Sequence, residues 1–230
     1  MSKSRILIVE DEASLVEVLS YNLQREGYEV VVAKEGREGL RKAQMLLPDL
    51  VILDLMLPGL NGLDICRELR ATPRTAGISI LMLTAKGEET DQVVGFAVGA
   101  DDYVTKPFSV KVLLQRIKVL LRRQDSSDSS GDVIEAAGIR IDKRAHQVTV
   151  NEKPITLTPT EFRLLETLLK QPGRAFTRHD LMDAAVGDTI VLERTIDVHI
   201  KSLRRKLEST GERIETVRGV GYRFQEVKSR

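Results

Sequence analysis

The stretch Leu50-Val-Ile-Leu-Asp-Leu-Met-Leu-Pro-Gly59 decides the fold of the first half of the chain. Four consecutive apolar residues are followed at once by a carboxylate, Asp54, and then by a turn with proline and glycine. A short apolar run bounded by a turn is typical of a strand buried on both faces of a parallel sheet. In such sheets ligands bind beyond the carboxyl ends of the strands, where Asp54 would lie.

Similar apolar runs alternate with helix-period segments on both sides of this stretch. Between residues 13 and 25, for example, Leu15, Leu19 and Leu23 recur at helical spacing and predict one buried face. The alternation predicts an α/β domain: a doubly wound, flavodoxin-like, five-stranded parallel sheet with helices on both faces. The expected strands are Ile6–Val9, Val30–Ala33, Leu50–Leu55, Ile78–Leu83 and Tyr103–Thr105, and the expected helices lie near residues 13–25, 36–46, 62–71, 88–98 and 109–123.

A polar segment divides the chain. Gln124-Asp-Ser-Ser-Asp-Ser-Ser-Gly-Asp132 has no apolar residue, and its residue types favour solvation or turns. We therefore expect a first domain over residues 1–123, a flexible linker over 124–132 and a second domain over 133–230. A length of 230 residues is ample for two domains of ordinary size.

The second half has a different pattern of elements. Short alternating strands are expected at residues 139–142 and 147–150, and Thr158-Pro-Thr-Glu161 has the composition of a helix start. Further helices are expected near 178–185 and 193–208. The chain closes with Ile214–Val217 and Tyr222–Phe224 around a glycine-containing turn, which predicts a hairpin. Three helices followed by a hairpin predict a winged helix-turn-helix domain.

Composition and charge limit the classes of protein. No apolar stretch approaches the roughly 20 residues of a membrane span, and the first residues are too few for a signal peptide. A single cysteine, Cys66, fits a reducing compartment, so we expect a cytoplasmic protein without membrane partners. Residues 133–230 hold 18 Lys/Arg against 14 Asp/Glu, a net charge of +4, while residues 1–123 are neutral. That balance permits nucleic-acid binding by the second domain.

Acids and hydroxyls follow the expected strands of the first domain. Because parallel strands end at one edge of a sheet, Glu10, Asp11 and Asp54 could converge there. Three adjacent carboxylates repel one another unless a cation neutralises them, and oxygen ligands suit Mg²⁺. A carboxylate nucleophile beside Mg²⁺ could accept a phosphoryl group, with Lys106 and Thr84 contacting the phosphoryl oxygens. Any one of these acids alone could instead be a helix cap or a surface charge.

The third helix of the second domain has a basic outer face. Ile196, Ile200, Leu203 and Leu207 form an inward stripe, and no acid occurs from residue 198 to 207. A basic amphipathic helix of this kind fits the major groove of DNA, although a solvated helix face is the simpler alternative for a charge run alone. The cations are Lys201, Arg204, Arg205 and Lys206.

The motifs of the first half resemble those of a known family. Val9-Glu-Asp-Glu12, Leu53-Asp-Leu-Met-Leu-Pro-Gly59, Leu83-Thr-Ala85 and Tyr103-Val-Thr-Lys-Pro-Phe108 look like receiver-domain motifs of two-component response regulators. The second half is similar to the winged-helix output domain of the OmpR/PhoB family, with the phosphate-regulon regulators most similar.

This resemblance implies roles for the residues at the strand ends. Asp54 would be the phosphoacceptor, and Mg²⁺ would be held by Asp11 and Asp54, by Glu10 through water and by the carbonyl of Met56. Lys106 would contact the phosphoryl group, before a cis peptide bond to Pro107. Thr84 and Tyr103 would form a switch pair that biases a two-state element.

The resemblance also implies a dimer and a DNA surface. Phosphorylation would favour a homodimer through the fourth helix, fifth strand and fifth helix, with cross-subunit ion pairs drawn from Asp101, Asp102, Lys111, Arg116, Arg122 and Arg123. Phosphates of DNA would mainly be contacted by Arg194, Thr195, His199, Lys201 and Arg205, and the bases would be faced or bordered by Asp197, Val198, Ser202 and Arg204. Arg218 would enter the minor groove from the hairpin tip, and Tyr222 would touch the DNA backbone.

Three positions depart from the family pattern. Gln92 and Val112 stand where an opposite-charge pair is common, which weakens the case for a strong dimer. Ser202 stands where close family members carry a base-contacting arginine, so the target site differs. The loop over residues 186–192 lacks the tryptophan that is common there in the family. In the family this loop often meets RNA polymerase.

The function that follows is a DNA-binding transcriptional regulator of a two-component system. A sensor histidine kinase would phosphorylate Asp54, and the dimer would bind repeats in promoter DNA. The chain would catalyse only its own Mg²⁺-dependent phosphoryl transfer and dephosphorylation. One alternative is an aspartyl-phosphate enzyme, but Met56 stands where a general acid would be needed. Another is a constitutive DNA-binding protein whose first domain only dimerises.

Overall fold

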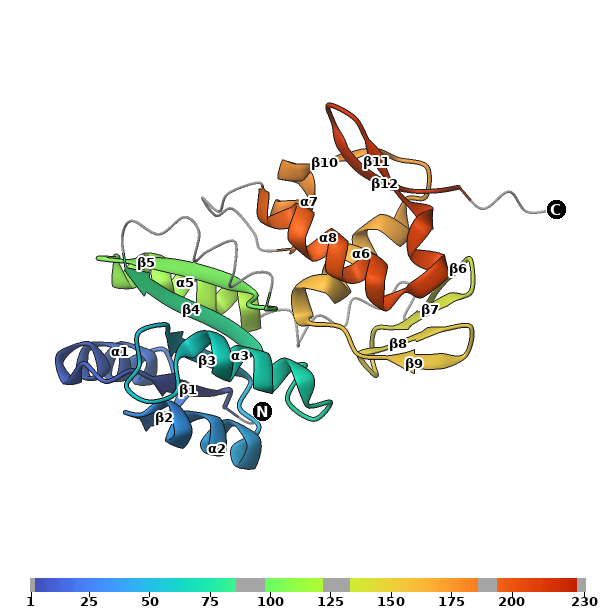
Figure 1. Ribbon diagram of the computed structural model, residues 1–230. Coiled ribbons are helices and arrows are strands. Elements are labelled where there is room, and N and C mark those ends of the chain that lie inside the picture. Colours follow the sequence, from blue (N-terminus) through green and yellow to red (C-terminus); the bar gives the residue numbers. More distant parts are fainter. Residues whose placement is uncertain (1–2, 86–97, 122–132, 186–193, 227–230) are drawn as a thin grey trace. The chain divides into compact units, whose positions relative to one another are not determined.

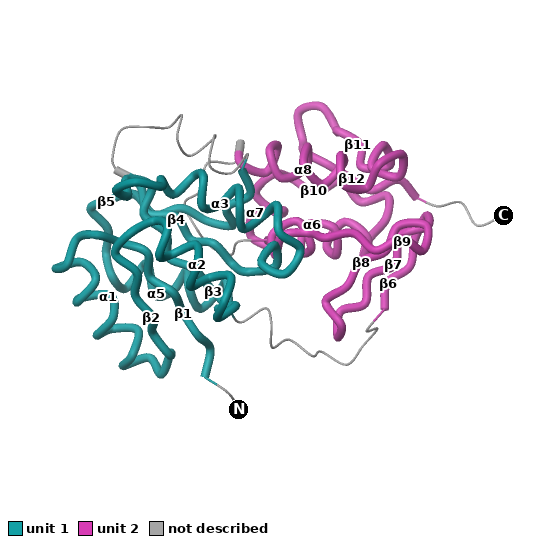
Figure 2. Tube along the Cα trace, turned by 60° about the horizontal axis from the view of Figure 1, so that its bottom comes forward, with its two compact units in different colours: residues 1–124 teal, residues 125–230 magenta. Residues whose placement is uncertain are grey.

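The computed structural model describes residues 3–85, 98–121, 133–185 and 194–226. The chain forms two compact units, residues 1–124 and 125–230, each of which has its own core (Figure 2). The expected helix at 88–98, the linker and the loop at 186–192 lie outside the described residues. The expected domain boundaries therefore stay predictions.

The first unit is built on a parallel sheet, as the apolar runs predict (Figure 1). Its strand order is β2-β1-β3-β4-β5, the flavodoxin-like order, in which the strand sequence reverses direction between β1 and β3. The predicted fold class of this unit is confirmed. Its strands are β1 (Arg5–Val9), β2 (Glu29–Ala33), β3 (Leu50–Asp54), β4 (Ser79–Ala85) and β5 (Asp102–Lys106).

Helices cover both faces of this sheet. Helices α1 (Ala13–Arg25) and α5 (Val110–Leu121) contact each other on one side, and α2 (Gly36–Leu46) and α3 (Gly62–Ala71) contact each other on the other. Apolar side chains of the sheet and of α1 and α5 form one buried cluster that includes Leu19, Ile52 and Ile117. Burial on both faces explains why β3 is apolar from Leu50 to Leu53.

The register of the strands brings distant residues to one edge of the sheet. Val9 of β1 pairs with Leu53 of β3, and Asp54 pairs with Leu83 of β4. The residues that follow β1 and end β3 are therefore neighbours, although more than 40 positions separate them in the chain.

The second unit is a winged helix, as predicted. An antiparallel sheet of four short strands precedes three helices, and the chain returns as a hairpin that pairs with a two-residue strand. Strands β6 and β10 were not expected, because runs of two to four residues carry little periodicity. The elements are β6 (Val133–Ala136), β7 (Ile139–Asp142), β8 (Gln147–Val150), β9 (Lys153–Ile155), α6 (Pro159–Lys170), β10 (Phe176–Thr177), α7 (Arg178–Ala185), α8 (Arg194–Lys206), the 3-10 helix η1 (Glu208–Arg213), β11 (Ile214–Val217) and β12 (Gly221–Phe224).

Local sequence accounts for the start of α6 and the packing of α8. The Thr158 side chain accepts from the backbone N–H of Glu161, and the Glu161 carboxylate accepts from the backbone N–H of Thr158. This capping box satisfies two backbone donors at the helix start. The inward stripe of α8 is fully buried in the core of the unit, as its spacing predicts: Ile196, Ile200, Leu203 and Leu207.

Candidate functional site

An acidic crevice lies at the carboxyl edge of the parallel sheet. Glu10, Asp11 and Asp54 each place a carboxylate oxygen within 4.8 Å of the others. Glu10 and Asp54 are buried, whereas Asp11 is exposed. The convergence expected from the strand ends is therefore present in the structure.

A lysine neutralises part of this negative charge. Nζ of Lys106, the last residue of β5, donates to Oδ2 of Asp54 at 2.7 Å and to Oε2 of Glu10 at 2.8 Å. The peptide bond from Lys106 to Pro107 is cis. One ammonium thus bridges two carboxylates that come from residues 52 and 96 positions away.

Burial and charge act in opposite directions on the groups in the crevice. Burial raises the pKa of Glu10, although its hydrogen bond from Lys106 opposes that rise. Burial lowers the pKa of Lys106, but its bonds to Asp54 and Glu10 outweigh burial and leave the pKa raised. Lys106 therefore stays an ammonium at neutral pH.

The loop after β3 holds Asp54 in place. The backbone N–H of Met56 donates to Oδ1 of Asp54 at 3.0 Å, while the Met56 side chain is 74% exposed. Helix α3 begins close behind this loop, with Asn61 as its cap. A Cβ on Gly62 would run into the carbonyl oxygen of Asp54 and come within 2.9 Å of the Leu55 Cα. The absence of a side chain at Gly62 is what lets α3 approach the site.

The proposed switch residues lie on the adjacent strands. Thr84 of β4 is 1% exposed and Tyr103 of β5 is 5% exposed, so the tyrosine ring is already inside the domain. Their switching roles remain predictions.

Three of the expected dimer residues are paired inside the receiver unit instead. Asp101 is fully buried and its Oδ2 accepts from Nη2 of Arg70 at 2.7 Å. Asp102 is 1% exposed and accepts from Nη1 of Arg116 at 2.7 and 2.9 Å. Asp101, Asp102 and Arg116 thus have partners within the unit, and their part in cross-subunit ion pairs stays a prediction.

The rest of the expected dimer surface is only partly described. Lys111 is exposed on α5, and Val112 beside it is 44% exposed. Gln92, Arg122 and Arg123 lie outside the described residues.

Fewer cations of α8 are exposed than its sequence indicates. Lys201 and Arg205 are exposed, and Val198 and Ser202 are partly exposed. At the hairpin tip Arg218 is also exposed. Lys206 turns inward, and its Nζ donates to Oε2 of Glu161 at 2.7 Å. The side chain of Arg194 is not among those described.

Two residues expected to contact DNA phosphates are buried. Thr195 is 2% exposed and His199 is 3% exposed. Such side chains offer little surface to a phosphate in the DNA-free chain, and their contacts with DNA stay a prediction. Because a helix has 3.6 residues per turn, both residues lie on the helix surface beside the apolar stripe, and they are buried with it.

Three further expected DNA contacts are bound to other parts of the same unit. The hydroxyl of Tyr222 donates to Oδ1 of Asp197 at 2.7 Å, and Asp197 also accepts from Nε of Arg178 at 2.8 Å. Arg204 donates to the hairpin backbone. No sequence pattern indicates a role for Arg178, because its partner lies 19 positions away on another helix.

Comparisons with known proteins agree with both units. Two family models match: a response regulator receiver domain over residues 6–118, and the C-terminal domain of a transcriptional regulatory protein over residues 152–224. The chain is 46% identical over 224 residues to the phosphate regulon transcriptional regulatory protein PhoB of Rhizobium meliloti, which covers 96% of this chain and 98% of that protein. It is 44% identical over 229 residues to the DNA-binding response regulator MtrA of Mycolicibacterium paratuberculosis, with coverage of 96% and 98%.

Solved structures give the same result. A mutant of RitR superposes with a TM-score of 0.77 at 31% identity, over 97% of this chain and 100% of that one. The response regulator DrrB of Thermotoga maritima, an OmpR/PhoB homologue, has a TM-score of 0.51 at 31% identity, over 98% and 100%.

The receiver fold, the acidic crevice and the winged helix define a two-component response regulator that acts by binding DNA. The chain belongs to the OmpR/PhoB family of transcriptional regulators. Its relatives are regulators of transcription rather than metabolic enzymes, and a protein of this class works with a histidine kinase. Among the described helices, none is long and apolar enough to cross a bilayer.

Proposed function

We propose that a sensor histidine kinase switches this chain by phosphorylating Asp54, and that the phosphorylated form binds promoter DNA as a homodimer. The observation that supports Asp54 is its place in the crevice, 2.7 Å from the Lys106 ammonium and next to two further carboxylates. A carboxylate held beside cationic charge is suited to accept a phosphoryl group.

The donor set of the crevice fits Mg²⁺. Three carboxylates that converge within 4.8 Å are hard oxygen ligands of the kind this ion takes. Glu10, Asp11 and Asp54 would hold the ion, with the carbonyl of Met56 as a further ligand. Bound Mg²⁺ would offset the negative charge of the transferred phosphoryl group.

The chain's own residues supply the rest of the mechanism. A carboxylate oxygen of Asp54 attacks phosphorus, the P–N bond to the kinase histidine breaks, and the imidazole nitrogen keeps that electron pair. Lys106 then moves its hydrogen bond from Asp54 to a phosphoryl oxygen, and the Thr84 hydroxyl contacts another. Water later hydrolyses the acyl phosphate on Asp54. The chain would therefore catalyse only its own phosphorylation and dephosphorylation.

The exposed cations of α8 and of the hairpin support DNA binding by the second unit. Lys201 and Arg205 would contact phosphates, while Arg218 would enter the minor groove. Two winged helices would bind repeated half-sites and act with RNA polymerase on bacterial promoters. Because bacterial promoters lie in the cytoplasm, the protein would act there. Lys111, Arg122 and Arg123 remain proposed contributors to the receiver dimer.

The test compares wild type with Asp54→Ala after incubation with Mg²⁺ and a small-molecule phosphodonor. Intact mass and oligomeric state are measured on the same samples, and Glu68→Ala, which changes an exposed acid on α3, serves as the matched control. We expect one added phosphoryl group and a shift to dimer in wild type and in the control, with neither in Asp54→Ala. An adduct on Asp54→Ala would remove Asp54 from the mechanism. A DNA affinity that the phosphodonor leaves unchanged in wild type would favour constitutive binding.

A further inference from the structure

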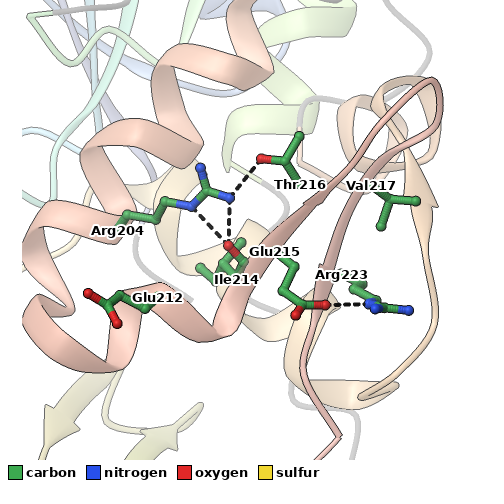
Figure 3. A pocket seen from close by; sticks show the side chains of 7 residues that line it. All are labelled: Arg204, Glu212, Ile214, Glu215, Thr216, Val217 and Arg223. Atoms are coloured by element: carbon green, nitrogen blue, oxygen red, sulfur yellow. Dashed lines mark hydrogen bonds and ion pairs between the residues drawn. The ribbon is translucent and has the colours of Figure 1, made fainter.

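The side chain of Arg204 leaves the outer face of α8 and binds the hairpin. Its Nε and Nη2 donate to the carbonyl oxygen of Ile214 at 2.9 and 2.5 Å, and Nη2 also donates to Oγ1 of Thr216 at 3.0 Å (Figure 3). Ile214 and Thr216 are the first and third residues of β11. One guanidinium on the recognition helix is thus attached to two points on the first strand of the hairpin.

The second strand of the hairpin is attached to the same helix. Tyr222 of β12 donates its hydroxyl to Asp197 of α8 at 2.7 Å. The guanidinium carbon of Arg204 lies 5.5 Å from the centre of the Tyr222 ring, and that of Arg178 lies 5.4 Å from it. Both distances fit cation–π contacts. Arg204 therefore touches both strands of the hairpin, and Asp197 touches one.

The hairpin is also held by its backbone and by buried apolar side chains. Phe176 and Thr177 of β10 pair with β12, Gly173 donates its backbone N–H to the Phe224 carbonyl at 2.8 Å, and Ile214 and Phe224 lie in the core of the unit. The turn from Arg218 to Val220 extends beyond that pairing and is exposed. β11 and β12 lead directly into this turn, so the position of the two strands sets the position of the turn. Contacts with β11 therefore help to set where Arg218 lies.

A groove of about 720 Å³ lies beside the hairpin and is lined by Arg204, Glu212 and residues of β11 and β12 (Figure 3). The other charged residues of its strands are already matched, since Nε of Arg223 donates to Oε2 of Glu215 at 2.6 Å. An arginine that turned outward to a base would leave the Ile214 carbonyl and the Thr216 hydroxyl without these bonds.

We propose that Arg204 is a positioning residue that fastens the wing to the recognition helix, and that it does not read bases. Base reading then falls to Val198 and Ser202 on the helix and to Arg218 on the wing. This inference rests on the proposed use of α8 and the hairpin in DNA binding.

The first arm of the test needs no DNA. Backbone amide hydrogen exchange is measured for β11 and β12 in the full chain, in wild type, Arg204→Ala, Arg204→Lys and Arg205→Ala. Arg205 is the matched control because it is the next residue of α8 and is exposed. We expect exchange of the hairpin amides to rise about tenfold or more in Arg204→Ala and to stay unchanged in Arg205→Ala. Lysine keeps the charge but cannot form the fork, so Arg204→Lys falls between wild type and Arg204→Ala.

The second arm measures affinity for a DNA fragment that wild type selects from a random library. In wild type, Arg218→Ala is expected to weaken binding by about tenfold. In Arg204→Ala the same change is expected to cost less than about threefold, because the wing is already loose. In the double variant with Arg205→Ala and Arg218→Ala, the fold-losses in DNA affinity of the two single variants should instead multiply.

Selection of sites separates the two roles. A positioning residue predicts that Arg204→Lys selects the same bases as wild type on the helix side of the site. Loss of preference at a single base pair, with unchanged hairpin exchange, would overturn the proposal. If Arg218→Ala leaves affinity unchanged, the wing contact of the proposed function fails, and hydrogen exchange still decides the role of Arg204.

Discussion

Cys66 is a buried thiol whose ionisation is linked to the stability of the receiver. Its side chain is fully buried in α3, and burial raises its pKa from an ordinary 9.0 to about 11. The unfolded chain therefore releases this proton at a lower pH than the folded chain. This contribution to stability is complete below pH 9 and is lost as pH rises toward 11.

We expect the free energy of unfolding of wild type, relative to Cys66→Ala, to fall by about 1.3 kcal/mol between pH 8 and pH 10. Urea unfolding of both proteins at the two pH values measures this change, because other titrating groups cancel in the comparison. A thiol reagent at pH 8 should label Cys66 in urea and not in the folded protein. A difference that is the same at both pH values would show that Cys66 ionises normally.

At the scale of elements, the approach of α3 to the phosphoacceptor loop depends on Gly62. The backbone N–H of Gly62 donates to the Leu55 carbonyl at 3.1 Å, and a Cβ there would collide with the Asp54 carbonyl. Gly62→Ala must therefore move α3 or the loop. We expect a loss of about 1–3 kcal/mol in unfolding free energy. Phosphorylation, followed by intact mass, should also slow because Asp54 is displaced.

Gly77 provides the matched control for this substitution. It is exposed, a Cβ there would meet nothing within 4 Å, and its backbone is not left-handed. Gly77→Ala should be neutral or should stabilise by up to about 1 kcal/mol, because it restricts only the unfolded chain. Equal losses in both variants would mean that close packing at Gly62 is not the cause.

At the scale of the whole molecule, the two units should unfold independently. Ile52 belongs to the core of the first unit and Leu165 to that of the second, and both are fully buried. Each substitution to alanine is expected to cost about 2–5 kcal/mol in its own unit. Calorimetry of the full chain should show Ile52→Ala lowering one transition and Leu165→Ala lowering the other. A joint shift of both transitions in either variant would show that the units unfold together.

Much of the fold was predictable because it depends on periodicity and on strand ends. The apolar run of β3, the capping box of α6 and the inward stripe of α8 are local patterns, and each produced the expected element. The convergence of Glu10, Asp11 and Asp54 was also predictable, since parallel strands end at one edge.

The roles of individual charged residues were less predictable. Asp101 and Asp102 were expected at a dimer surface, but Arg70 and Arg116 bind them within the unit. Asp197 and Arg204 were expected to face bases, but the hairpin binds both. A sequence pattern indicates which face of a helix is polar, and it says nothing about which distant residue reaches that face.

The sequence by itself determined the two-domain organisation, the order of the described strands and helices in the first unit and the acids at the carboxyl edge, because these follow from local propensity and from the geometry of parallel sheets. The tertiary structure alone decided which cations of α8 stay exposed. Packing brings β11, β12 and α6 beside that helix, and buried or half-buried polar atoms there need hydrogen-bond partners. Arg204 and Lys206 supply them, which leaves Lys201 and Arg205 on the outer face.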